Sequence, residues 1–138
     1  MPNPYKGSGA EFAIGPASNN LTVISGAGNG LSDVDIPESK TTRVTPGGGS
    51  SYRAETGTED FSVSFTVDAN SLTWPLLYRK SGVEIFFRRG PLGTATGSPR
   101  ETGSFIADSI PVAIQTGDVL TFTVQAGGNG PITYDTYP

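Results

Sequence analysis

Asp33, Asp35 and Glu38 form the first group of side chains in this sequence that could take part in chemistry. Carboxylates spaced so closely could bind calcium, which prefers several oxygen ligands. The three residues lack the twelve-residue loop pattern and its fixed glycine, however, and acidic residues that alternate along a half-exposed strand need no ligand. We therefore expect no metal site in this stretch.

Two further patterns resemble binding or catalytic sites. The glycine-rich run at residues 26–30 resembles a phosphate-binding loop, but no helical pattern follows it and no Lys-Ser or Lys-Thr pair closes it. We interpret this run as a turn. Glu59, Asp60 and Glu84 could be the carboxylates of a sugar hydrolase, which must lie close together. The sequence does not place them at that distance, and it has few aromatic residues to stack on sugars.

Three arginines, Arg88, Arg89 and Arg100, flank one predicted loop. They could form a basic patch, but in an acidic chain such residues more often pair with carboxylates of a neighbouring subunit or line a solvated rim. Both interpretations stay open. The sequence has no histidine and no cysteine, so the usual general base and the thiolate ligands are missing. We expect a protein that is not an enzyme, with no catalytic residue, no bound metal and no cofactor.

The composition indicates a single domain made mainly of β-strands. A chain of 138 residues can bury a core of its own, and 19 glycines and 11 prolines favour short strands joined by turns. The net charge of −4 argues against a free nucleic-acid binder, but not against a protein that lets DNA pass without holding it. The sequence shows neither an apolar membrane span nor a signal-peptide core, and we expect no membrane binding by the subunit.

The middle of the chain contains the clearest structural signals, in the order strand, helix, strand. Residues 61–67 alternate apolar with polar side chains, which is the period of a strand with one buried face. A short helix should begin near Thr73, with Pro75 in its first turn, and should end at Gly82. Residues 83–89 return to a strand.

Further short strands are expected on both sides of this stretch. Each is a run of apolar or alternating residues that ends at a glycine, a proline or a polar turn. The predicted strands cover residues 11–14, 21–24, 31–36, 101–107, 110–114 and 119–125. Residues 132–138 are predicted to be a short tail.

Two polar segments should extend from the domain as arms. Residues 1–9 are rich in proline and glycine and should form a loose N-terminal arm. Residues 40–60 contain few apolar side chains, and a loop of this length is usually functional or disordered. We interpret it as a long, flexible extended loop. Its central glycines would let it fold back as a hairpin if a partner held it.

A core of large apolar residues should hold the other elements together as an antiparallel β-sandwich or small barrel, flanked by one short α-helix. The predicted core residues come from the alternating strands and from the helix. They are Phe61, Val63, Phe65, Trp74, Leu76, Leu77, Ile85, Leu120 and Phe122. The predicted fold class is therefore mainly β, with the long arm loop outside the core.

The order of these elements resembles that of the major tail tube proteins of long-tailed bacteriophages. The similarity covers most of the chain as a pattern of elements and not as one sharp motif. The segments that carry it are residues 7–12, 30–34, 41–59 and 61–67, the helix after Asp68, the strand after that helix, and residues 119–132.

This resemblance implies a structural virion protein of the tail, assembled in the host cytoplasm. Six copies would form a ring, and stacked rings would form a tube that conducts DNA during ejection and meets other tail proteins at its ends. The N-terminal residues would contact the next ring, and the long loop would reach a neighbouring subunit. The inter-subunit residues of this arm would be Thr41, Arg43, Val44, Tyr52, Arg53 and Glu55.

An acidic subunit could line such a tube with carboxylates that repel the phosphates of passing DNA. The candidates are Glu84, Glu101, Asp108 and Asp118, near the ends of the later strands. Pairing between strand edges of identical copies would complete the ring. Two alternatives stay open. One is a carbohydrate-binding or adhesin-like β-sandwich module, a monomer with a row of exposed aromatic residues, and the other is a capsid decoration protein, which would form no tube.

Overall fold

The architecture is that of a computed structural model, which describes residues 9–26, 29–32, 34–47, 50–113 and 119–138. Between residues 38 and 59 the description covers the backbone alone. The elements are β1 (Glu11–Ala17), β2 (Asn20–Val23), β3 (Glu38–Gly47), β4 (Ser50–Asp68), α1 (Trp74–Leu77), β5 (Glu84–Gly90), β6 (Pro99–Ile106), β7 (Val112–Ala113), β8 (Thr121–Gly128) and β9 (Thr133–Thr136).

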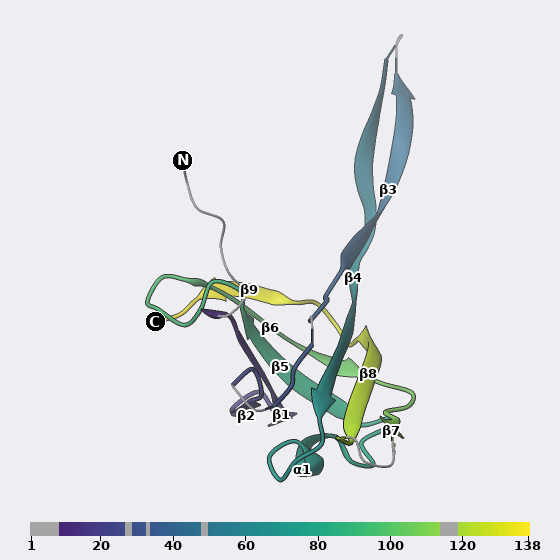
Figure 1. Ribbon diagram of the computed structural model, residues 1–138. Helices are drawn as coiled ribbons and strands as arrows, with labels where there is room; N and C mark the ends of the chain where they lie inside the picture. Colours follow the sequence, from purple (N-terminus) through teal and green to yellow (C-terminus); the bar gives the residue numbers. More distant parts are fainter. Residues whose placement is uncertain (1–8, 27–28, 33, 48–49, 114–118) are drawn as a thin grey trace.

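The described strands pair antiparallel in one sheet, in the order β2-β1-β5-β6-β8-β4-β3, while β7 pairs with β8 and β9 with β6. The sheet curls but does not close. Figure 1 shows that β3 and β4 project from one end of the curled sheet as a long hairpin, and that α1 lies at the opposite end. The prediction of a mainly β fold with one short helix is confirmed.

Strand β4 belongs to both the hairpin and the body of the domain. Residues 50–61 pair with β3, and residues 62–68 pair with β8. The alternating Phe61, Val63, Phe65 and Val67 are all buried, because every second side chain of a strand faces the same side of the sheet. The chain therefore enters the body at Phe61, where the apolar alternation begins.

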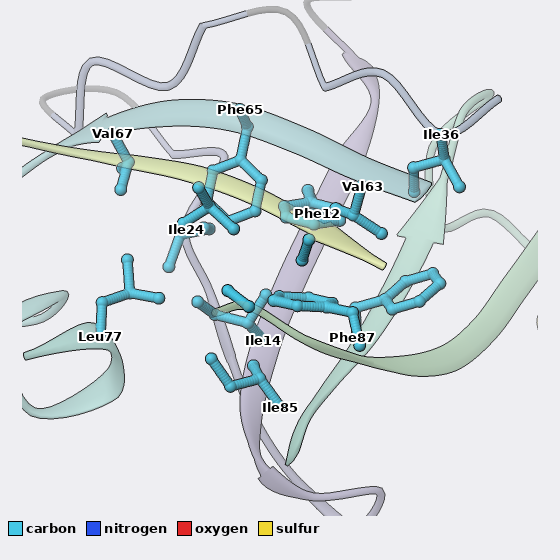
Figure 2. Packing of buried hydrophobic residues seen from close by; sticks show 14 of the residues in the cluster. Phe12, Ile14, Ile24, Ile36, Val63, Phe65, Val67, Leu77, Ile85 and Phe87 are labelled. Carbon is cyan, nitrogen blue, oxygen red and sulfur yellow. The ribbon is translucent and has the colours of Figure 1, made fainter. Parts of the chain in front are cut away.

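The buried residues form one core inside the curled sheet. Figure 2 shows Phe12 and Ile14 of β1 facing Val63 and Phe65 of β4, with Phe87 of β5 beside them. The rings of Phe12 and Phe65 meet edge to face, with their centroids 5.2 Å apart. The other residues predicted for the core are placed as follows: Leu77, Ile85 and Phe122 are buried, Leu76 packs against the core from a half-buried position, and Leu120 is half-buried.

Trp74 is not a core residue, contrary to the prediction, because 39% of it is exposed. Thr73 and Leu77 are fully buried and lie four residues apart, so they occupy the inward side of the turn. Successive residues of a helix lie about 100° apart around its axis, so Trp74 is turned away from the inward side that Thr73 and Leu77 occupy. Its ring instead stacks on Tyr78, with the centroids 4.3 Å apart, and reaches the edge of the core at Phe122.

Strands β3 and β4 pair as a hairpin within a single chain, whereas the sequence predicted a flexible loop at residues 40–60 that would fold back as a hairpin if a partner held it. Its two strands pair from Glu38 and Phe61 to Gly47 and Ser50, with a register shift between Lys40 and Thr42. Antiparallel backbone hydrogen bonds need no apolar core, and β-branched and aromatic residues favour extended backbone. The described part of the arm is therefore a two-stranded extension of the sheet.

Three other expectations require correction. The helix ends at Leu77 and not at Gly82, because Tyr78 is extended and Arg79 has a positive φ of 58°. The residues of 31–36 that the structure describes form no strand, although Asp35 makes an isolated bridge to Ser64 on β4. The predicted tail at residues 132–138 contains β9, which pairs with β6. The sequence does not predict β9, because its four residues are all exposed and show no alternation of apolar and polar side chains.

Candidate assembly surfaces

The hairpin of β3 and β4 is the first surface available to a partner. Residues 42–47 pair with residues 50–55, so the paired backbone continues up to the turn. All six residues predicted for inter-subunit contact lie on this hairpin: Thr41, Arg43, Val44, Tyr52, Arg53 and Glu55. Their role in contact stays a prediction, and their side chains lie outside the described part. Figure 1 shows the hairpin extending well away from the curled sheet.

The borders of the sheet are the second such surface. β2 stands at one end of the strand order and pairs with β1 alone among the described strands. At the other side of the body, residues 29–32 and 34–37 run beside β4 and bond to its backbone at Thr66 and Ser64, with N···O distances of 2.8 and 3.0 Å, so they cover this edge of β4. The outer edge of a border strand such as β2 presents backbone donors and acceptors that can pair with a strand from another chain.

The three arginines pair with carboxylates of the same chain. The sequence had predicted either pairing with a partner's carboxylates or a solvated rim, and this prediction is corrected. Arg89 donates to both oxygens of Glu101, its register partner on β6, at 2.8 and 2.6 Å from Nη2. Arg88 Nε donates to Glu11 at 2.7 Å. The third pair, between Arg100 and Asp135, is equally close. Each pair joins adjacent strands, because cross-strand neighbours lie within reach of each other.

A cluster of polar residues joins the beginning of the first described strand to the end of the chain. We call it the terminal latch, and it consists of Glu11, Arg88, Arg100, Asp135 and Tyr137. Tyr137 is only 9% exposed, and its hydroxyl donates to Glu11 at 2.9 Å. The guanidinium of Arg100 lies 5.5 Å from the centre of the Tyr137 ring. The hydrogen bond from Arg100 lowers the pKa of the Asp135 carboxyl. This cluster could not be predicted from the sequence, because nothing in residues 132–138 marks a strand.

The four acids proposed to line a channel fall into different environments. Glu101 is buried and paired with Arg89, so it offers no free carboxylate, contrary to the expectation. Glu84 is half-buried and accepts hydrogen bonds from Ser104 at 2.8 Å and from the side-chain amide of Asn129. Asp108 is exposed. Asp118 lies outside the described residues. Two of the four therefore remain candidates within the described chain.

Exposed apolar side chains gather around the single helix. Leu72, Trp74 and Tyr78 are each about two-fifths exposed, and Pro75 and Leu120 line the hollow beside them. This surface lies at the end of the molecule opposite the hairpin (Figure 1). Exposed apolar groups of this kind, when they are contiguous, mark contact surfaces in soluble proteins.

Among the residues that the structure describes, no group of three or more acidic, histidine or cysteine side chains is arranged to hold a metal ion. Of the acids considered for calcium, Asp33 lies outside the described residues. No helix of the described chain is long and apolar enough to cross a membrane.

The fold defines a class: a mainly β domain with an open, curled antiparallel sheet, a projecting hairpin at one end and a short helix at the other. Chains of solved particle structures share it, and two of these structures are similar over nearly the whole of this chain. One is the tail of an empty gene transfer agent particle, computed with helical refinement and C6 symmetry, with a TM-score of 0.66 and 12% identity over 96% of this chain and 100% of that chain. The other is the virion of a native gene transfer agent particle, with a TM-score of 0.61 at the same identity and coverage.

No protein-family model matches the sequence, and no curated protein matches it. The likeness to the two particle structures is therefore a likeness of fold, seen over 96% of this chain and the whole of each matched chain. The resemblance to tail tube proteins that the order of elements indicated is confirmed at that level.

Proposed function

We propose that this chain is a structural protein of a phage-like tail, in which it assembles into stacked hexameric rings that form a tube for DNA. The observation that carries the proposal is the shared fold with a chain of a gene transfer agent tail, at a TM-score of 0.66 and over the full length of that chain. A fold can host unrelated functions, so the surfaces of this chain must carry the rest of the argument.

The two borders of the sheet support assembly from identical copies. A strand border left open in a monomer is an aggregation hazard, and a closed ring removes the hazard by pairing each border with the next copy. In this chain β2 lies at one end of the strand order, and residues 29–32 and 34–37 run along the other side of the body. A ring built through these borders would continue the sheet from subunit to subunit.

The hairpin supports contact beyond the ring. Its second strand is the first part of β4, and the same strand continues into the core, where residues 62–68 pair with β8. A projection of this kind can reach an adjacent ring or subunit, and the six arm residues are the ones that we expect to make that contact. Residues 1–9 would contribute further contacts between rings.

The charge of the subunit supports passage of DNA and not its binding. The net charge is −4, and the three arginines at the end of β5 and the start of β6 are each paired with a carboxylate. Phosphates would find few unpaired cations there. Of the proposed channel acids, Glu84 and Asp108 are the candidates that fit. A tail location, with assembly in the host cytoplasm and other tail proteins at the tube ends, belongs to the same proposal.

One observation favours a second candidate, a carbohydrate-binding or adhesin-like module. Trp74 and Tyr78 are both exposed and stacked on each other, and exposed aromatic rings are a common platform for sugars. A single stacked pair is less than the row of aromatics that such a module would show. The same pair fits a contact between subunits equally well, since aromatic residues are enriched at interfaces.

Negative-stain imaging of the purified chain over a range of concentrations tests the proposal. Hexameric rings, or tubes with a central hole, are the expected result. A chain that stays monomeric at high concentration would refute ring assembly and favour the binding module. Trimers without tubes would favour a capsid decoration protein.

A further inference from the structure

Residues 132–138 form the end of this sequence, and we call them the strap. Its middle is β9, whose four residues are exposed and pair with β6 alone among the described strands (Figure 1). Ile132 before β9 and Tyr137 after it are both buried, and Ile132 belongs to the core. One backbone ladder, the ion pair between Asp135 and Arg100, and two buried side chains therefore hold the strap on the domain.

The site that receives Tyr137 is built from separate parts of the chain. Its hydroxyl donates to the carboxylate of Glu11 on β1 at 2.9 Å. A Cβ atom at Gly90, on β5, would lie 2.5 Å from the hydroxyl oxygen, so a side chain there would exclude the phenol. The backbone is bound as well, because Tyr137 N donates to Ser98 O and Gly97 N donates to Tyr137 O, both at 3.0 Å. The site therefore recognises both an extended backbone and one tyrosine.

The rest of the sheet stays paired without the strap. Residues 99–102 of β6 bind β9, and Glu101 and Thr102 among them also pair with β5 on the other side. Strand β8 ends at Gly128, which pairs with Phe105 of β6. The other ladders between described strands contain no residue of the strap. The strap can therefore detach by a local opening that leaves the other strands in place.

A fixed residue and a pivot separate the strap from β8. Asn129 is fixed, because its N–H donates to Ser104 O at 2.9 Å and its side-chain amide donates to Glu84. Its carbonyl oxygen also accepts from Ser104 Oγ at 3.2 Å. Gly130 follows with a positive φ of 85°, and Pro131 comes next. Glycine rotates freely about its backbone bonds, and a hinge needs only a few such residues at the end of an element.

We propose that the strap is an exchangeable strand, and that its site on β1, β5 and β6 accepts the strap of a second copy of this chain. The structure defines the occupant, because a second copy offers the same strand and the same two buried side chains to an identical site. The contacts are equal in both arrangements. A chain's own strap competes at an effective concentration on the order of millimolar, so exchange should be rare in dilute solution and common where copies are crowded. Exchange needs only two copies and does not depend on ring assembly.

Disulfide trapping tests the exchange, because the chain has no cysteine of its own. Thr102 on β6 and Thr133 on β9 are register partners. The Cα atoms of such partners lie about 4.5–5.5 Å apart, which a disulfide can span. Full chains with Thr102→Cys are mixed with full chains with Thr133→Cys in a glutathione buffer. A link between positions 102 and 133 then joins two chains only where β9 of one copy lies on β6 of the other.

We expect the fraction of chains linked from 102 to 133 to rise roughly tenfold or more between about 0.01 and about 1 mM chain. Non-reducing electrophoresis and peptide mapping measure this fraction. Mixtures of Thr133→Cys with Asp108→Cys are the matched control, since Asp108 is exposed and lies beyond the other end of β6. They should show only the low level of links that collisions produce. Equal linkage in the two mixtures would overturn the proposal.

A chain that carries both Thr102→Cys and Thr133→Cys shows whether this pair can close. In dilute solution it should form a disulfide within one chain, and failure to close would contradict the register of β6 with β9 and overturn the proposal. If it closes while the mixture links no more than the control, exchange is refuted. Imaging scores rings separately. Linked dimers without rings would leave exchange standing and refute the proposed function, whereas rings without links would do the reverse.

Discussion

The three arginines show that the neighbouring strand determines whether a charged side chain is paired. Arg88, Arg89 and Arg100 look alike in the sequence, as a basic group beside a loop. In the structure each one lies opposite or diagonal to an acid on the neighbouring strand, and each is paired there. Strand register, and not the number of arginines, therefore determines that this part of the surface carries little unpaired positive charge.

Trp74 provides a test of burial at the residue scale. Trp74→Ala should cost only about 1–2 kcal/mol of unfolding free energy, because the ring is 39% exposed and loses mainly its stacking on Tyr78. Phe122→Ala is the comparison, since that ring is fully buried, and it should cost roughly 3–5 kcal/mol. Urea unfolding of both variants measures the difference. Equal losses would contradict the exposed position of Trp74.

Tyr137 should affect stability at alkaline pH. Burial, and then the hydrogen bond to Glu11, raise the pKa of the Tyr137 phenol above its ordinary value of 10.0. A raised folded-state pKa means that the contribution is complete below pH 10 and is lost as the pH rises through the folded value. The unfolding free energy of the wild type should therefore fall above pH 10 more steeply than that of Tyr137→Phe. Phenolate absorbance should show one late-titrating tyrosine, absent from the variant.

At the scale of elements, β4 determines how the hairpin meets the body. Among the side chains of that strand that the structure describes, Phe61 is the first that is buried, and its ring lies against Gly128 so closely that a Cβ there would overlap it. The ring also meets Phe87 edge to face, with centroids 5.9 Å apart. The base of the hairpin is therefore anchored in the core, although the arm itself projects away from it.

Shortening the hairpin should separate folding from assembly. Replacing residues 46–51 by Asn-Gly would close the strands with a two-residue turn next to the Thr45 and Tyr52 pair. The unfolding free energy should change by less than about 0.5 kcal/mol, since the removed residues lie far from the core. Imaging should show that the stacking of rings is lost or strongly reduced. A six-residue Gly-Ser replacement of the same segment is the control that keeps its length. Normal tube growth in the shortened variant would rule out the arm as a contact.

For the whole molecule, assembly should appear as added stability. A ring that pairs open sheet borders binds only the folded chain, so the apparent melting temperature should rise with protein concentration. Scanning calorimetry across the concentration at which rings form checks this. The melting temperature of a monomeric binding module would not depend on concentration, and that result would count against the ring.

Elements with a strong local pattern were predictable from the sequence alone. The apolar alternation of residues 61–67 covers the part of β4 that lies in the body, and the runs at residues 83–89 and 119–125 overlap β5 and β8. The helix also begins where predicted, near Thr73, and Asn70 accepts hydrogen bonds there from the backbone of Leu72 and Thr73. In these places the side chains that form the element are its immediate neighbours in the chain.

Features that depend on residues far apart in the chain were decided only by the tertiary structure. The sequence itself determined the charge, the absence of histidine and cysteine, and the alternation that makes a mainly β fold. The hairpin, β9, the exposed face of Trp74 and the contact between Tyr137 and Glu11 came from pairing across long separations. Glu11 and Tyr137 are 126 residues apart, and no local pattern records their contact. The register of the sheet brings them together, because each strand's position depends on the strand beside it.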